Sequence, residues 1–166
     1  MIKKIMTLSV LALASVGAAA NGFDIEVNYE NQRFDEPDVN FDAIGFLVGY
    51  RWDFDSDTSG TLEAGLTFGL SDDNISPVIV DLNGSGSIGY RLTQKLEGDW
   101  SIYGRAVYAD VGISVATAFT DDIDADGGGL GFGGGIMWRG VTAGYTLYTG
   151  DLDEYSVFNI GYRWQL

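Results

Sequence analysis

The side chains that could carry chemistry in this chain are charged ones, because histidine and cysteine are both absent. The 166 residues include 24 acidic and 9 basic side chains, and the net charge is −15. Histidine is the usual general base near neutral pH, and a serine without such a base has no ordinary route to activation. We therefore expect no enzyme activity, no catalytic residue, no disulfide, no cofactor and no metal centre. So acidic a chain also repels phosphate backbones, which excludes nucleic acid as a partner.

One acidic segment has the spacing of a calcium-binding loop. Asp121, Asp122, Asp124 and Asp126 lie within six residues, as the carboxylates of such loops do, but the expected distal glutamate is missing. We interpret this segment as a solvated acidic loop.

A second set of charges falls on the polar faces of segments in which polar and apolar residues alternate. In a strand, residues two apart share a face. Seven charged residues would then form a lumenal charge cluster inside a closed sheet: Asp24, Glu26, Arg51, Glu63, Arg91, Arg105 and Arg163.

Neighbouring strands would bring opposite charges of this cluster together. Glu63 is expected between Arg51 and Arg91, and Arg163 would meet the first strand if the sheet closes. Buried charges need partners, so a plug of structural salt bridges is the favoured interpretation. The alternative is the charged constriction of a narrow pore, for which Gly131, Gly133 and Gly135 could leave space.

Eight segments with period-two alternation must position these charges. They cover residues 23–30, 44–53, 61–70, 78–92, 100–108, 129–138, 141–147 and 155–166. Three short turns, near residues 56, 96 and 140, alternate with four mostly longer, acidic loops at 31–40, 71–77, 111–127 and 151–154. Within 78–92, Leu82 is expected on the outward apolar face, opposite Asp81 and Asn83.

The beginning of the chain predicts export from the cytoplasm. Lys3 and Lys4 precede an apolar run, residues 5–16, and the small residues 18–20 follow. This is the pattern of a secretory signal peptide, residues 1–20, with the mature domain at 21–166. An N-terminal membrane anchor is the alternative, but the apolar run is short for a spanning helix, which needs about 20 residues.

The end of the chain is a strand with a large apolar face, reading YSVFNIGYRWQL from Tyr155. The tetrapeptide at 161–164 repeats the one at 49–52, as the boundary between lipid and water would recur at strand ends. Four residues of this strand resemble the C-terminal targeting signal of outer-membrane β-barrel proteins: Asn159, Gly161, Trp164 and Leu166. The resemblance implies recognition by the barrel-assembly machinery.

Taken together, residues 21–166 resemble the small eight-stranded outer-membrane barrels, of the type of OmpX and the OmpA membrane domain. The resemblance implies an all-β fold, an eight-stranded antiparallel up-and-down transmembrane β-barrel, located in the bacterial outer membrane among lipid and lipopolysaccharide. A soluble lipocalin-like carrier would instead turn its apolar face inward. The polar faces are rich in Gly, Ser and Thr, which suit a cramped interior. The four tryptophans lie near strand ends, where aromatic girdles occur.

Two functions are compatible with this fold. The first is a non-enzymatic barrel with acidic extracellular loops and a structural or adhesin-like surface role, contacting host or other cell-surface ligands. The second is a small, narrow pore for ions or small solutes.

Overall fold

The computed structural model describes residues 22–34, 39–75, 78–117, 120–152 and 155–166. The expected signal peptide at 1–20 and the cleavage point before Asn21 lie outside the described residues. The strands are β1 (Gly22–Phe34), β2 (Val39–Asp53), β3 (Thr58–Gly69), β4 (Asp72–Ile75), β5 (Val78–Lys95), β6 (Trp100–Thr117), β7 (Thr120–Trp138), β8 (Val141–Gly150) and β9 (Tyr155–Gln165). In this described part of the chain, no helix is long and apolar enough to cross a membrane.

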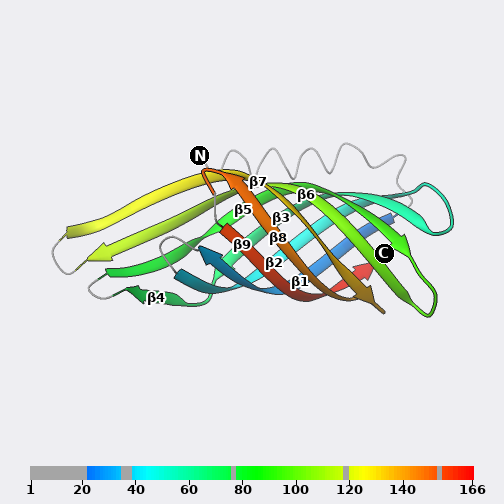
Figure 1. Cartoon of the computed structure of the whole chain (residues 1–166), viewed down its shortest axis with the longest axis horizontal. Helices are drawn as coiled ribbons and strands as arrows, with labels where there is room; N and C mark the ends of the chain where they lie inside the picture. Colours follow the sequence, from blue (N-terminus) through cyan, green and yellow to red (C-terminus); the bar gives the residue numbers. More distant parts are fainter. Residues whose placement is uncertain (1–21, 35–38, 76–77, 118–119, 153–154) are drawn as a thin grey trace.

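The strands form one closed antiparallel barrel (Figure 1). Each strand pairs with its neighbours along the chain, except that β3 and β4 do not pair with each other, and β1 also pairs with β9. Both β3 and β4 pair with β5, at successive stretches of that strand, so together they occupy one position in the wall. Nine strands therefore make an eight-stranded up-and-down barrel, as predicted.

The apolar faces of the strands point outward. On β9, Phe158, Ile160, Tyr162 and Trp164 are all exposed, whereas Asn159 and Arg163 between them are buried in the lumen. The same alternation runs around the barrel. An apolar exterior matches a barrel surrounded by lipid and rules out the lipocalin arrangement.

The two ends of the barrel differ. One end, called the turn end, holds the turns at 54–57, 96–99 and 139–140, together with Gly22 and Leu166. The opposite end is called the loop end. There the β6–β7 hairpin projects past β8 (Figure 1), since β7 pairs with β8 only as far as Gly129 but with β6 as far as Thr120.

Three of the expected loops are shorter than predicted. The prediction of the longest loop, at 111–127, is wrong, because β6 continues to Thr117 and β7 begins at Thr120. The loop at 31–40 shrinks because β1 and β2 extend into it, and β4 occupies part of 71–77. Gly and Asp are disfavoured in strands, but pairing with adjacent strands overrides so weak a preference.

A register shift in β5 corrects a second expectation. The β5–β6 pairing slips between Leu82 and Gly84, the latter having φ 133°, a conformation that favours glycine. The shift turns Leu82 into the lumen, whereas Asp81 and Asn83 are exposed. The prediction placed them the other way round because strict alternation cannot reveal an inserted residue.

Candidate functional site

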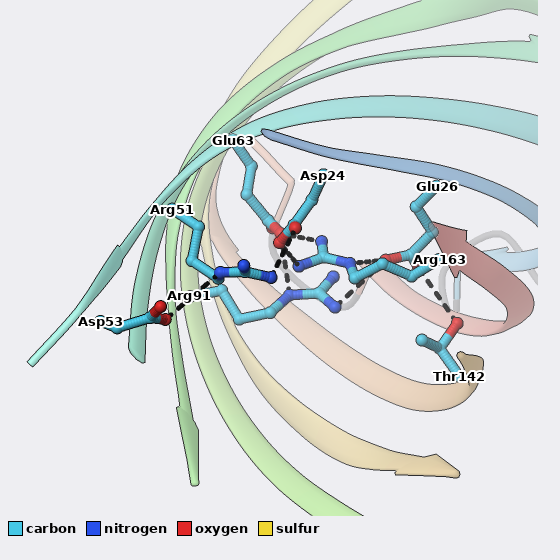
Figure 2. A network of polar contacts seen from close by, with 8 residues as sticks. All are labelled: Asp24, Glu26, Arg51, Asp53, Glu63, Arg91, Thr142 and Arg163. Atoms are coloured by element: carbon cyan, nitrogen blue, oxygen red, sulfur yellow. Dashed lines mark hydrogen bonds and ion pairs between the residues drawn. The ribbon is translucent and has the colours of Figure 1, made fainter. Parts of the chain in front are cut away.

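The turn-end half of the lumen contains a network of buried charges (Figure 2). We call it the turn-end ion network, and its members come from five strands: Asp24 and Glu26 of β1, Arg51 of β2, Glu63 of β3, Arg91 of β5 and Arg163 of β9. Each side chain points inward because it falls on the inner face of its strand.

Arg163 is the centre of this network. Its Nη1 lies 3.1 Å from Asp24 Oδ2 and its Nε donates to Glu26 Oε2 at 2.8 Å. Its Nη2 contacts Glu63 Oε1. Three carboxylates from β1 and β3 thus surround one guanidinium of the last strand, and these contacts cross the lumen as well as the β1–β9 seam.

Arg91 makes the second bridge between the same two glutamates. Its Nη1 lies 3.1 Å from Glu26 Oε2 and its Nε 2.9 Å from Glu63 Oε1. The guanidinium also lies 4.2 Å from the centre of the Tyr103 ring, within the range of a cation–π interaction. Thr142 adds a hydrogen bond to Glu26 Oε1 at 3.1 Å. The network is therefore compact and almost fully removed from water.

Arg51 lies at the outer edge of the network, and its predicted pairing with Glu63 is wrong. It contacts Asp24 Oδ1 and Asp53 Oδ1, both at 3.3 Å, whereas Glu63 pairs with Arg91 and Arg163. The register explains the difference, because Glu63 is opposite Gly49, and Arg51 is opposite Thr61, closer to the turn end.

Arg105, the seventh predicted member, is not part of the network. It also faces inward, from β6, but no ion pair joins it to a carboxylate among the described residues. It lies deeper in the lumen, next to a small cavity.

The inward glycines of β7 do not leave the open space that the pore alternative requires. A Cβ at Gly135 would lie 2.6 Å from the Tyr103 hydroxyl, and one at Gly131 would lie 2.7 Å from Cε1 of Tyr148. These rings come from the neighbouring strands β6 and β8, where they are paired directly opposite the glycines. The glycines accommodate aromatic rings that fill the lumen, so this expectation is wrong.

The loop-end half of the lumen is filled by apolar side chains, which the sequence analysis missed. We call this set the apolar plug: Val39, Phe41, Ala43, Leu82, Val107, Ala109, Val111, Tyr148, Leu152, Tyr155 and Val157. The Tyr155 ring packs against the rings of Phe34 and Tyr148, with ring centres 4.5 Å and 4.9 Å away. A signal was available, since Val39, Phe41 and Ala43 share a face in the sequence, but the second strand was predicted to begin only at residue 44.

One cavity opens at the turn end of the lumen, and a smaller one lies inside the closed region. An open cavity of about 650 Å³ lies at the turn end, lined by residues that include Arg51, Lys95, Arg139 and Arg163. A second cavity of about 20 Å³ lies between the ion network and the apolar plug. The first is a vestibule that ends at the ion network.

The four residues of the terminal motif do not form a single site. Asn159 is buried in the lumen, and a Cβ at Gly161 would lie 2.6 Å from Cβ of Asn28. Trp164 and Leu166 are exposed on the outside of the barrel. Their role in assembly therefore stays a prediction.

The closed barrel, apolar outside and filled inside, is the architecture of the small eight-stranded bacterial outer-membrane β-barrels. Solved structures of this class are similar to the chain. One is Ail, the attachment invasion locus protein of Yersinia pestis, which is 17% identical, with 86% of this chain and 97% of that chain covered and a TM-score of 0.59. Ail has also been solved with the heparin analogue sucrose octasulfate.

Two further structures of the class are similar. Neisserial surface protein A is 14% identical, with 89% of this chain and 98% of that one covered and a TM-score of 0.58. The N-terminal β-barrel domain of Pseudomonas aeruginosa OprF is 15% identical, with 85% of this chain and 97% of that one covered and a TM-score of 0.51. No protein-family model matches the chain, and no curated protein matches it in sequence. The likeness therefore concerns the fold.

Proposed function

We propose that this chain is a non-enzymatic integral protein of the bacterial outer membrane that does not conduct ions and that acts through its loop end. Its role would be structural or adhesin-like. The observation that carries this proposal is the closure of the lumen by two successive layers, the turn-end ion network and the apolar plug. Because a filled lumen does not carry solutes, the function falls to the exposed surfaces of the barrel.

The ion network supports the non-conducting part of the proposal. Each of its three carboxylates, Asp24, Glu26 and Glu63, contacts two guanidinium groups. An ion entering from the vestibule would have to break these contacts in a low-dielectric interior, where each is strong. Beyond the network it would meet the aromatic rings of the apolar plug.

Charge supports a surface role for the loop end. The β6–β7 hairpin projects there, and its sequence includes Asp121, Asp122, Asp124 and Asp126. Such a surface would attract cationic groups or surfaces bridged by divalent cations, including those bound to lipopolysaccharide. It would repel a sulfate-rich ligand of the kind present in the Ail complex. We therefore expect this chain to favour cationic ligands, although it shares its fold with a protein that was solved with an anionic one.

Conductance across a planar lipid bilayer tests the closed lumen. The purified, refolded protein should give no stable single-channel steps. A variant with Tyr103→Ala and Tyr148→Ala, which empties the glycine-lined side of the lumen, serves as the comparison. Regular channel steps from the wild-type protein would contradict the proposal.

Cell adhesion tests the surface role. Cells that carry the protein should adhere to polylysine-coated surfaces more than to heparin-coated ones, and the difference should fall as salt rises. Changing the four hairpin aspartates to asparagine should abolish the difference. Asp57→Asn with Glu97→Gln, at the turn end, is the matched control and should have no effect. Equal adhesion of wild-type cells and cells without the protein would refute the adhesin-like role.

Assembly provides a separate test of location. We propose that the barrel-assembly machinery recognises the last strand, so deleting the last three residues should leave unassembled protein in the periplasm. Membrane fractionation measures this. Normal outer-membrane levels of the truncated chain would contradict the proposed role of Trp164 and Leu166.

A further inference from the structure

A small polar cavity lies in the middle of the lumen, between the turn-end ion network and the apolar plug. Its volume is about 20 Å³, and its lining includes Glu30, Gln32, Thr67, Ser87, Arg105 and Tyr155. A cavity of at least about 10–15 Å³ accommodates one water molecule if two to four polar groups line it. The size and the lining both meet this condition.

Arg105 lines this cavity with unused hydrogen-bonding capacity. Its Nε is buried without a hydrogen-bond partner, and none of the described carboxylates forms an ion pair with it. Tyr148, Glu63 and Glu30 compensate the charge of the guanidinium, so the cost that remains is that of one buried N–H donor without an acceptor group. The cavity is the space available for such a group.

Glu30 lines the same cavity with the complementary charge. Its Oε2 accepts a hydrogen bond from Gln32 Nε2 at 2.7 Å and one from Thr67 Oγ1 at 3.3 Å. A carboxylate has lone pairs for about four hydrogen bonds, so Glu30 can accept more. A donor and an acceptor of opposite charge thus face one cavity without touching each other.

We propose that this cavity is a binding site for a single structural water, which accepts a hydrogen bond from Arg105 Nε and donates one to Glu30. Water fits better than an ion because both charges are present. A chloride would be repelled by Glu30 and a sodium ion by Arg105, whereas water serves both groups at once.

The water would extend a chain of hydrogen bonds that begins in the apolar plug. Tyr155, whose ring belongs to the apolar plug, donates to Gln32 Oε1 at 2.7 Å, and Gln32 donates to Glu30. With the water in place, this chain of hydrogen bonds continues to Arg105. A polar connection would then run from the aromatic ring of Tyr155 to Arg105 on β6, and it would leave no opening for ions.

Nuclear magnetic resonance of the refolded protein in lipid nanodiscs tests the site. With ¹⁵N-labelled arginine, the Nε–H of Arg105 should show a magnetisation-transfer peak to water with the sign of a long-lived contact. Arg139 is the control, since its Nε–H donates to Asp99 at the exposed turn end, where the surrounding water exchanges rapidly. A Ser87→Val variant, which fills the cavity, should lose the Arg105 peak while the peaks of Arg91 and Arg163 stay unchanged.

Diffraction from crystals grown with bromide gives a readout that does not depend on the variant. Water should appear beside Arg105 with no anomalous signal. A bromide peak there, or Arg105 in direct contact with Glu30, would overturn the proposal. So would the absence of the long-lived water peak in the wild-type protein.

Discussion

The two halves of the lumen fill the same width of barrel by opposite means. In the turn-end half, six charged side chains form a network in which most members have more than one partner. In the loop-end half, apolar and aromatic side chains pack together. Charge pairs depend on the identity of each partner, whereas apolar packing depends mainly on volume. The halves should therefore respond differently to mutation, both in the size of the effect and in its additivity.

The largest effect is expected from Glu26→Ala in the turn-end ion network. Glu26 is 0% exposed and is the shared partner of Arg91 and Arg163. Its removal leaves both guanidinium groups short of a partner, and breaking a buried pair costs about 3–5 kcal/mol. Urea unfolding in lipid vesicles would measure the loss. A cost under about 1 kcal/mol would mean that vestibule water already solvates the network.

A smaller loss is expected from Val111→Ala in the apolar plug. Val111 is 2% exposed, and burying a side chain of this kind contributes about 1.5–3 kcal/mol, of which the alanine keeps part. Val111→Thr has nearly the same shape but adds a buried hydroxyl, so it should also destabilise the barrel. If the threonine variant were as stable as the wild type, the loop-end half would be hydrated rather than apolar.

Additivity is the sharper test of the difference between the two halves. The Glu63–Arg163 pair should show a coupling energy of about 0.5–3 kcal/mol in a double-mutant cycle, because the residues are in contact. Glu63 and Arg51 should couple more weakly than this pair, since they are not in contact and are joined only through Asp24 and Arg163. Strong coupling of Glu63 with Arg51 would restore the pairing expected from the sequence and contradict the register of β2 and β3.

The sequence predicts the barrel better than it predicts the lumen, and the reason is physical. Alternation reveals which residues share a face, so the outward residues of β9 and the inward position of Glu63 could be read directly. Partner choice depends on register across strands, which local patterns do not contain, and Arg163 reaches Glu63 only because the barrel is closed. The bulge at Leu82 and the rings opposite Gly131 and Gly135 are likewise consequences of pairing. The apolar plug was missed because long strands continue beyond the expected apolar band.

The smallest effect is expected from an ion pair that lies outside both halves. Arg139 Nε contacts Asp99 Oδ2 at 2.9 Å and joins two turns at the turn end, but the side chains are 66% and 60% exposed. Water and salt screen such a pair, so it contributes about 0.2–1 kcal/mol. Asp99→Asn is the appropriate change, because Asp99 has φ 67° and asparagine tolerates that conformation. The small loss measured at low salt should vanish near 1 M NaCl, where the Debye length is about 3 Å. The cost of Glu26→Ala should persist under the same conditions, because salt does not reach the buried network. If the two losses fell together with salt, the turn-end ion network would be as accessible to water as the surface pair.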